Sequence, residues 1–353
     1  MTDVFEIRAG STALEKIRDE GLPQSGIDIM LGASGGPKWF VLTGLDKCLI
    51  GEYFKDRQQP LNLLGTSAGA WRLSCYAQEN ALEAHHRLEQ GYLLTEYSIE
   101  PDAAEVSRKC RVLARDMLGE NGANEILANG VIRFNLIAAK SRGLIKSDVN
   151  LKQLSGLSLA AIGNTFSRKT LGAFFTRTLF HHPDANAPFY KMDNLPTERV
   201  SLSEENMLDV IMASGSIPLA MEGVRNIAGA PKGVYRDGGI TDYHFDMAFP
   251  KGEGLILYPH FYQRIVPGWF DKSLRWRKPA IEHCDKLVLV YPSESFVSKL
   301  PYGKIPDRTD FKTFSFDERV KYWQKVIKES DRLGDAFLEA IETGKIRQKV
   351  KPL

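Results

Sequence analysis

The sequence predicts an α/β protein built on a mostly parallel central sheet. Apolar runs of strand length at residues 27–31 and 61–64 are each followed by a glycine-containing turn and then by a helical pattern. Strands and helices that alternate in this way favour parallel neighbours joined by right-handed crossovers. Further apolar runs at 131–139, 254–258 and 286–291 are expected to add strands.

Helical patterns occupy much of the sequence between these strands. Thr12–Asp19 is expected to form a short helix in an N-terminal lead-in, and Lys38–Phe54 carries its apolar residues on one side, as a helix packed on a core does. Residues 79–129 are predicted to be helical throughout. Gly119 and Gly130 are expected to end helices in that span.

The second half of the chain mixes short strands with helices. Within residues 151–196, an apolar and aromatic run at 171–180 fits either a strand or a lid. Ser201–Glu204 resembles a capping box that would start a helix. Strands are expected at 224–227 and 233–236.

One long amphipathic helix is expected at the C-terminal end, over about residues 315–344. It would begin at a capping box formed by Ser315 and Glu318 and break at Gly334. A lid over a functional site would come either from the long helical span or from the ambiguous segment described above.

Composition and charge restrict the classes of protein to consider. The 353 residues give room for one large or two ordinary domains, and 43% hydrophobic and 25% charged residues are typical of a soluble globular chain. A net charge of +2 without a long basic run does not favour nucleic acid as a partner. No apolar stretch reaches the about 18 residues that a transmembrane helix needs. Residues 1–6 carry acids and no signal-peptide core, so the expected location is cytoplasmic.

The four cysteines lie far apart and form no C-x-x-C pair, so neither a zinc nor a redox motif is indicated. They are expected to be buried and reduced. No metal and no organic cofactor is predicted. The cysteines are Cys48, Cys75, Cys110 and Cys284.

The stretch Gly65-Thr66-Ser67-Ala68-Gly69 matches G-x-S-x-G between a predicted strand and a predicted helix, where this pattern marks a nucleophile elbow. The tight turn would hold the Ser67 hydroxyl clear of the sheet. A side chain at Gly65 or Gly69 would collide with the strand and helix packed there. The following helix would direct free N–H groups and a partial positive charge at an oxyanion formed on Ser67.

A second match to the same pattern, residues 32–36, is centred on Ser34 and also follows an apolar run. Two further glycines and Pro37 come after Ser34, which makes a loop with consecutive free N–H groups instead of an immediate helix start. We interpret this loop as an anion-binding turn. Ser67 is therefore the candidate nucleophile, and Ser34 is its rival.

A serine hydroxyl needs a base to take its proton. The chain has seven histidines, and none lies in an obvious catalytic motif. Asp237 is the carboxylate with a special setting, because it ends a predicted strand and Gly238-Gly239 let the backbone turn beside it. A single aspartate at a strand end is more often a turn residue. Here the paired glycines and the Ser67 elbow favour a catalytic role.

Taken together, these motifs resemble those of the patatin-like phospholipases. The family's landmarks occur in the family's order within about residues 27–242. They are the glycine-rich loop at 32–38, G-x-S-x-G at 65–69, Ala-Ser-x-x-Ile-Pro at 213–218 and D-G-G at 237–239.

The resemblance implies a three-layer α/β/α fold related to the α/β hydrolases, with helical insertions, and the whole chain is expected to form one such domain. It implies hydrolysis of a lipid acyl ester, as phospholipases A and lysophospholipases perform. Ser67 would attack the ester and Asp237 would serve as its base without a histidine. Backbone N–H groups of Gly35 and Gly36, together with that of Ala68, would form the oxyanion hole.

The chain departs from the family's pattern at two places. Ala33-Ser34 interrupts the usual run of glycines, so the motif does not fix the oxyanion donors. His244 follows D-G-G where the family has Asn-Pro, and it is either a helper or, more ordinarily, a structural residue. Lys38 would bind a substrate phosphate, brace the glycine loop or lie idle at the surface; Pro37 before it excludes a Walker A loop.

The segment 258–278 interleaves aromatic and cationic side chains, which suits either an anionic membrane surface or a loop packed on the core. Its aromatic residues include Phe261, Tyr262, Trp269, Phe270 and Trp276.

Two other functions remain open from the sequence. One is an α/β hydrolase whose triad adds a histidine such as His260 to Ser67 and Asp237. The other is a non-catalytic lipid-binding protein with a degenerate site, which the interrupted glycine loop would fit.

Overall fold

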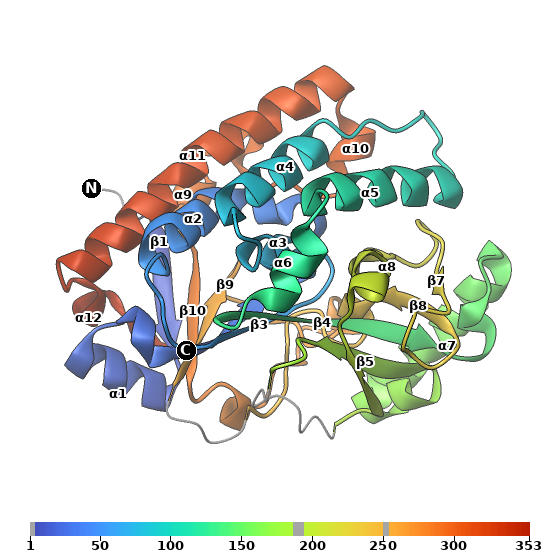
Figure 1. Cartoon of the computed structure of the whole chain (residues 1–353), viewed down its shortest axis with the longest axis horizontal. Helices are drawn as coiled ribbons and strands as arrows, with labels where there is room; N and C mark the ends of the chain where they lie inside the picture. Colours follow the sequence, from blue (N-terminus) through green and yellow to red (C-terminus); the bar gives the residue numbers. More distant parts are fainter. Residues whose placement is uncertain (1–3, 186–193, 250–253) are drawn as a thin grey trace.

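The computed structural model describes residues 4–185, 194–249 and 254–353, and its strands form one eleven-stranded sheet flanked by helices (Figure 1). The strand order is β11-β1-β10-β9-β2-β3-β4-β5-β6, with β8 on β4 and β7 on β8. The strands are β1 (Phe5–Ala9), β2 (Ile27–Gly32), β3 (Leu61–Gly65), β4 (Ile132–Ser141), β5 (Phe175–His181), β6 (Thr197–Ser201), β7 (Val224–Arg225), β8 (Val234–Asp237), β9 (Leu255–Pro259), β10 (Leu287–Pro292) and β11 (Lys351–Pro352).

The centre of the sheet is parallel, as the sequence predicts. Strands β10, β9, β2, β3 and β4 follow one another in parallel, while β1 joins β10 and both β5 and β8 join β4 in the antiparallel sense. Strands β3, β9 and β10 are buried along their whole length, which is typical of parallel strands covered on both faces.

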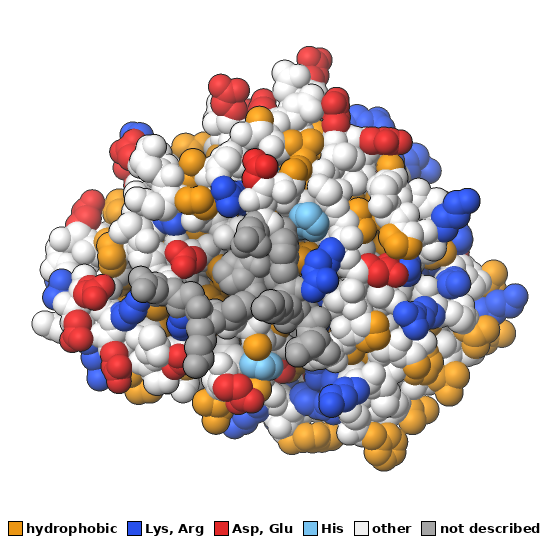
Figure 2. Space-filling model, turned by 60° about the horizontal axis from the view of Figure 1, so that its bottom comes forward, with side chains coloured by type: hydrophobic (Ala, Val, Ile, Leu, Met, Phe, Trp, Pro, Cys, Tyr) orange, Lys and Arg blue, Asp and Glu red, His pale blue; other side chains and the backbone are white. Residues whose placement is uncertain are grey.

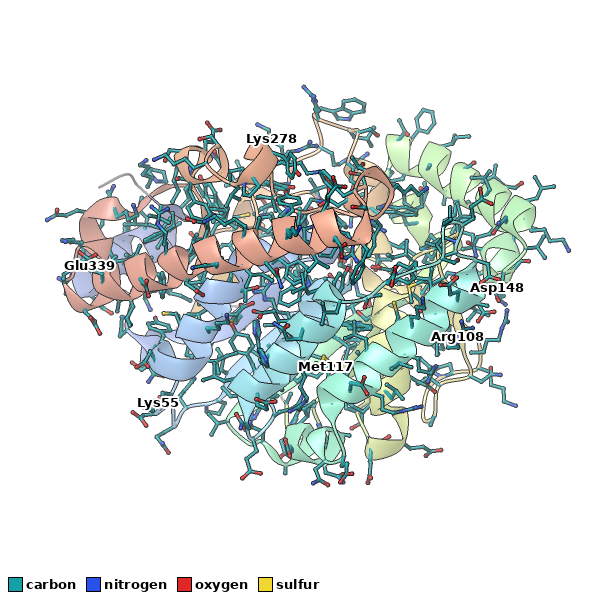
Figure 3. The ribbon with its side chains drawn as sticks, turned by 90° about the horizontal axis from the view of Figure 1, so that it is seen from above. Lys55, Arg108, Met117, Asp148, Lys278 and Glu339 are labelled. Atoms are coloured by element: carbon teal, nitrogen blue, oxygen red, sulfur yellow. The ribbon has the colours of Figure 1, made fainter. Side chains whose placement is uncertain are left out.

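Long helices form a layer over one face of this sheet. Seen from above in Figure 3, α11 runs across the molecule from the labelled Glu339, and α5 with Arg108 and Met117 lies farther along the same layer. The α-helices are α1 (Ser11–Glu20), α2 (Thr43–Cys48), α3 (Ala68–Tyr76), α4 (Ala81–Leu93), α5 (Ala103–Leu118), α6 (Gly122–Ala128), α7 (Asn150–Phe166), α8 (Glu204–Gly215), α9 (Glu294–Val297), α10 (Asp310–Thr313), α11 (Phe316–Glu342) and α12 (Ile346–Lys349).

Several predicted elements need correction in the first half of the chain. The N-terminal lead-in also contains β1, which pairs with β10 and so belongs to the sheet. The helix predicted at 38–54 starts as a 3-10 helix, η2 (Gly36–Leu42), and ends as a π-helical turn, η3 (Leu49–Tyr53). Residues 79–129 form α4, α5 and α6, and Gly119 ends α5 as predicted. Gly130 does not end α6, because Asn129 occupies that position.

The ambiguous segment 151–196 begins with α7, and its run at 171–180 contains strand β5 rather than a lid. Residues 186–193 of this segment lie outside the described chain. The capping box at the start of α8 joins Ser203 to Asn206, and not Ser201 to Glu204. Ser201 is still paired with His181 in the β6 ladder, so the helix starts two residues later than the motif suggests.

The capping box of Ser315 and Glu318 is confirmed, but α11 continues unbroken through Gly334. A Cβ at Gly334 would lie 2.4 Å from the Gly44 carbonyl oxygen, so this glycine permits close helix packing and does not mark a break. Of the four cysteines, only Cys75 is fully buried; the other three are half-buried, and all four are free thiols.

The edge of β4 brings two distant strands end to end. Gly65 of β3 pairs in parallel with Leu136, and Asp237 of β8 pairs in the antiparallel sense with Ala138. Strand β5 pairs with the opposite edge of β4. The strands β3 and β8 therefore share one edge of β4, and they run toward each other. Only Ile137 separates their pairing positions, so the residues that follow both strands must meet there.

Candidate active site

Ser67 lies in the sharp turn between β3 and α3. Its backbone has φ 51° and ψ −131°, a conformation that is costly for a residue with a side chain and that marks a strained position. A Cβ at Gly69 would lie 2.1 Å from the Gly32 carbonyl oxygen, and one at Gly65 would lie 2.5 Å from Ala70 Cα. The steric need for both glycines is therefore confirmed.

Ser67 and Asp237 are in direct contact across the β3–β8 junction. The Ser67 hydroxyl donates a hydrogen bond to Asp237 Oδ2 at 2.7 Å, and the Gly239 N–H donates to Oδ1 at 2.7 Å. Burial raises the pKa of the Asp237 carboxyl, while the bonds from Ser67 and Gly239 act in the opposite direction. A carboxylate with a raised pKa that already accepts the serine proton in a hydrogen bond is a stronger base than an exposed one.

Two serines of the segment 213–218 hold the backbones of both residues. The Ser67 N–H donates to Ser214 Oγ at 3.0 Å, and the Ser214 hydroxyl donates to the Ile137 carbonyl at 2.7 Å. The Asp237 N–H donates to the carbonyl oxygen of Ser216 at 2.9 Å. This end of α8 therefore fixes the strained serine and the aspartate relative to each other.

The residues predicted as oxyanion donors line the two cavities that meet at Ser67. Gly36 has φ 57° and opens η2, while Ala68 opens α3, so each occupies a position whose N–H has no partner inside its own helix. Gly35 and Gly36 line a small cavity of about 20 Å³ that we call the polar cavity, because Ser67, Asp237 and Arg308 also line it. Ala68 lines a larger cavity on the other side of Ser67.

Ser34, the rival nucleophile, has a structural position. Its side chain is 1% exposed, and its hydroxyl donates to Thr66 Oγ1 at 2.9 Å. The Thr66 hydroxyl donates in turn to the Asp242 carbonyl. The buried Arg177 guanidinium donates two hydrogen bonds, of 2.6 and 2.7 Å, to the Asp242 carboxylate. Ser34 thus ties the glycine loop to the segment after D-G-G.

The histidines do not complete a triad. Within the described chain, no histidine forms a hydrogen bond to Ser67 or Asp237. His244 is buried, its Nδ1 accepts from the Val266 N–H at 3.0 Å, and burial holds its pKa well below the usual value. Burial also lowers the pKa of His260 to about 4. Both rings are therefore neutral packing groups, edge to face at 4.2 Å.

Three cations lie around the polar cavity. Arg308 lines it, and a Cβ on Gly36 would lie 3.1 Å from Arg308 Cγ. Lys272 Nζ sits 4.0 Å from the ring centre of Tyr243, which lines the same cavity. Burial and the nearby charges of Arg308 and Lys38 lower the pKa of Lys272 to about 7. Among the described residues, none of the three cations has a carboxylate within ion-pair distance.

Lys38, the predicted substrate-binding residue, is half-buried and does not line this cavity. Its pKa is lowered by burial and then by Arg308. The sequence offered no motif for Arg308, which follows the Lys304–Asp307 ion pair in a loop. Ser214 lay within the recognised segment 213–218, but its bond to Ser67 depends on the tertiary fold.

The larger cavity is apolar and measures about 260 Å³. It meets the polar cavity at Gly36, Ser67, Ile217 and Arg308. Helix α4 contributes Tyr92 and helix α5 contributes Val106, Cys110 and Leu113 to its wall, so part of the long helical span lines the cavity. Its large apolar side chains include Trp71, Tyr92, Val106, Leu113, Met221 and Phe311.

Most aromatic side chains of 258–278 pack inward. Phe261 is buried under the glycine loop, Trp269 lines the polar cavity, and Phe270 lies 6.4 Å from the ring of Phe175. Trp276 is the most exposed of the set, at 68%. In the described chain, no three His, Cys, Asp or Glu side chains gather as metal ligands would, and no helix is long and apolar enough to cross a membrane.

No protein-family model and no curated protein sequence matches this chain. Among solved structures, it is similar to VipD from Legionella pneumophila, with 15% identity and a TM-score of 0.32 over 74% of this chain and 55% of that one. It is also similar to human GIVD cytosolic phospholipase A2, with 11% identity and a TM-score of 0.32 over 95% of this chain and 63% of that one. The chain thus spans less than two thirds of either protein. Similarity at this level carries no argument about chemistry, so the chemistry must be argued from the residues of this chain.

Ser214→Ala should loosen the turn at Ser67. The substitution removes the acceptor of a buried N–H, which costs about 1–3 kcal/mol of unfolding free energy. Urea unfolding should show this loss, and hydrogen exchange of the Ser67 amide should become faster. Ser216→Ala is the matched control, because Ser216 holds Asp237 through its backbone carbonyl and not through its side chain. Equal Ser67 exchange in the parent and Ser214→Ala would contradict this role.

Proposed function

We propose that this protein is a serine acyl-ester hydrolase that acts on lipid esters through a Ser67–Asp237 dyad. The observation that carries the proposal is the 2.7 Å hydrogen bond from the Ser67 hydroxyl to the Asp237 carboxylate, at the junction of a polar and an apolar cavity. A strained serine, an adjacent base and nearby free N–H groups are the parts that acyl transfer requires.

In the acylation step, Asp237 takes the proton of the Ser67 hydroxyl while the Ser67 oxygen bonds to the ester carbonyl carbon. The carbonyl oxygen becomes an oxyanion that accepts hydrogen bonds from the N–H groups of Gly35, Gly36 and Ala68. Loss of one such donor typically lowers the rate about 10²- to 10³-fold. When the ester C–O bond breaks, Asp237 returns its proton to the departing alcohol, and the acyl group stays on Ser67.

Water then replaces the alcohol. The water oxygen bonds to the acyl carbon while Asp237 takes a proton from the water. Asp237 then gives this proton to the Ser67 oxygen as the carboxylic acid leaves. Both half-reactions need Asp237 ionised. Because burial raises the pKa of this carboxyl, the rate should fall at a higher pH on acidification than it would for an exposed aspartate.

The two cavities suit the two ends of a lipid ester. The apolar cavity between α3, α4 and α5 would take the acyl chain, since burying each methylene contributes about 0.8 kcal/mol. The polar cavity, whose volume of about 20 Å³ has room for about one water molecule, would take only the ester oxygen atoms, and the alcohol side beyond them would lie near Arg308 and Lys272. Unpaired cations beside the ester favour a negatively charged headgroup, and hence a phospholipid or lysophospholipid. Lys38, which is close enough to Arg308 to feel its charge, would add to the positive potential there.

The alternative functions find less support. A triad with His260 would need a hydrogen bond between this ring and Ser67, whereas the Ser67 hydroxyl donates to Asp237 and His260 Nδ1 lies 2.6 Å from the Tyr262 carbonyl oxygen. The interrupted glycine loop does not prevent the contact between Ser67 and Asp237. A non-catalytic lipid-binding site would not need this contact.

Ser67→Ala and Asp237→Asn should each lower kcat/KM for a p-nitrophenyl ester at least about a thousandfold, because each removes a group that acts in the transition state. Ser34→Ala and His260→Gln are the controls and should keep the rate within about tenfold. Circular dichroism would establish that each variant is folded. A fully active Ser67→Ala protein would overturn the proposal, and a folded but inactive His260→Gln protein would favour the triad.

Lys272 should make recognition of a charged headgroup depend on pH. Its ammonium is protonated below a pKa of about 7 and loses its charge as the pH rises. For lysophosphatidylglycerol, whose phosphodiester keeps one negative charge, KM should rise about tenfold through this range. Lys272→Arg should remove the rise and Lys272→Met should give the high KM at every pH. A KM that stays constant in the parent would exclude Lys272 from headgroup binding.

A further inference from the structure

Helix α7 presents to solvent an apolar face that no described residue covers. The α7 face consists of five side chains that are between 51% and 85% exposed. Lys152 is the only charged residue of the helix. A surface helix ordinarily turns charged residues outward, so a row of exposed large aliphatic and aromatic groups marks an interaction site. The five residues are Leu151, Leu154, Leu159, Ile162 and Phe166.

Other exposed apolar groups extend the α7 face at both ends. Leu144 and Val149 precede the helix and are 48% and 58% exposed. At the other end, Arg277 Nη2 donates to the carbonyls of Asn164 and Thr165 at 2.7 and 3.2 Å, which brings its exposed neighbour Trp276 close to the helix end. In Figure 2, hydrophobic side chains gather with Lys and Arg at the lower right, on the side where Figure 1 places α7.

The charges around the α7 face are almost all positive. The exposed cations have no carboxylate within ion-pair distance in the described chain. Asp148, beside the helix start (Figure 3), is already bound by Arg225 and Arg236. Glu222 is an exposed acid near it, next to the Gly223 whose N–H donates to Asp148. An apolar surface rimmed by uncompensated positive charge is complementary to a negatively charged lipid surface. The cations are Lys146, Lys152, Lys169 and Arg275.

The α7 face is joined to the mouth of the site by buried polar contacts. The Leu219 N–H donates to Gln153 Oε1 of α7, and the neighbours of Leu219 in the sequence, Pro218 and Ala220, line the two cavities. Asn164 of α7 donates to Asp271 at 2.6 Å, in the short turn η8 (Trp269–Asp271) whose Trp269 lines the polar cavity. The buried side of α7 therefore packs against segments that line both cavities.

We propose that the α7 face and Trp276 form a docking surface for an anionic lipid bilayer. The helix would lie in the interface plane with its apolar side chains among the acyl chains, Trp276 at headgroup depth and the four cations on lipid phosphates. The bilayer would thus contact the protein chiefly through α7, with Arg275 and Trp276 at the edge of the contact, and not through the inward-packed aromatic residues of 258–270. Lipid would reach Ser67 from this surface, but docking itself does not depend on the chemistry of the dyad.

The test is binding to vesicles of ether-linked phosphatidylglycerol and phosphatidylcholine, which have no ester to hydrolyse. The full-length parent should co-sediment with them and bind pure phosphatidylcholine vesicles weakly. Leu159→Gln/Ile162→Gln/Phe166→Gln should weaken binding at least about tenfold, since it removes three exposed apolar anchors. Lys146→Glu/Lys152→Glu/Lys169→Glu should abolish the preference for the anionic lipid.

The matched control removes the same number of exposed apolar groups elsewhere. Leu82→Gln/Ile99→Gln/Ile281→Gln should bind vesicles like the parent. All variants should keep the parent's rate on the water-soluble ester p-nitrophenyl butyrate, so a failure of the dyad and a failure of docking are distinguishable. The proposal is overturned if the α7 variant binds like the parent, if the parent does not bind anionic vesicles, or if the α7 variant instead converts a dimer into a monomer.

Discussion

The functional centre depends on the way in which β3 and β8 share one edge of β4. The two strands run toward each other with only Ile137 between their pairing positions, so the chain must turn away at both ends. The elbow after β3 exposes Ser67, and the D-G-G turn after β8 presents Asp237. A Cβ at Gly238 would lie 2.0 Å from the Ile137 carbonyl oxygen, which shows how closely the turn approaches β4. A contact between residues 170 positions apart thus follows from sheet register.

This arrangement holds costly features in place. Ser67 has a positive φ, Asp237 is a buried carboxylate, and each costs free energy that the surroundings must offset. The offsets are backbone hydrogen bonds at Ser214 and Ser216 and the interior pair of Arg177 and Asp242. These supports come from the end of α8, from β5 and from the segment that follows β8, and they surround the place where the serine meets its base. The outer parts of the site, Arg308 and the α7 face, lie in loops and on the surface.

The sequence could predict what depends on local chemistry. The strand-turn-helix context of Gly65–Gly69, the glycines after Asp237 and the capping box at Ser315 each carry their cause within a few residues. It could not place β1, whose five residues become a strand only by pairing with β10 from the far end of the chain. The same limit applies to Gly334, which looks like a break until the carbonyl of Gly44 is seen against it, and to Arg308, which reaches the cavity through tertiary packing alone.

The central claim is that Asp237 activates Ser67, and labelling with a fluorophosphonate followed by peptide mapping tests it most directly. The reagent bonds to an activated serine and reports its position. The account predicts one adduct, on Ser67, that is lost in Asp237→Asn and kept when each histidine is replaced. An adduct on Ser34 would mean that the nucleophile lies in the glycine-rich loop and not at Ser67. Absence of any adduct on the folded parent would contradict the claim that this chain is a serine hydrolase.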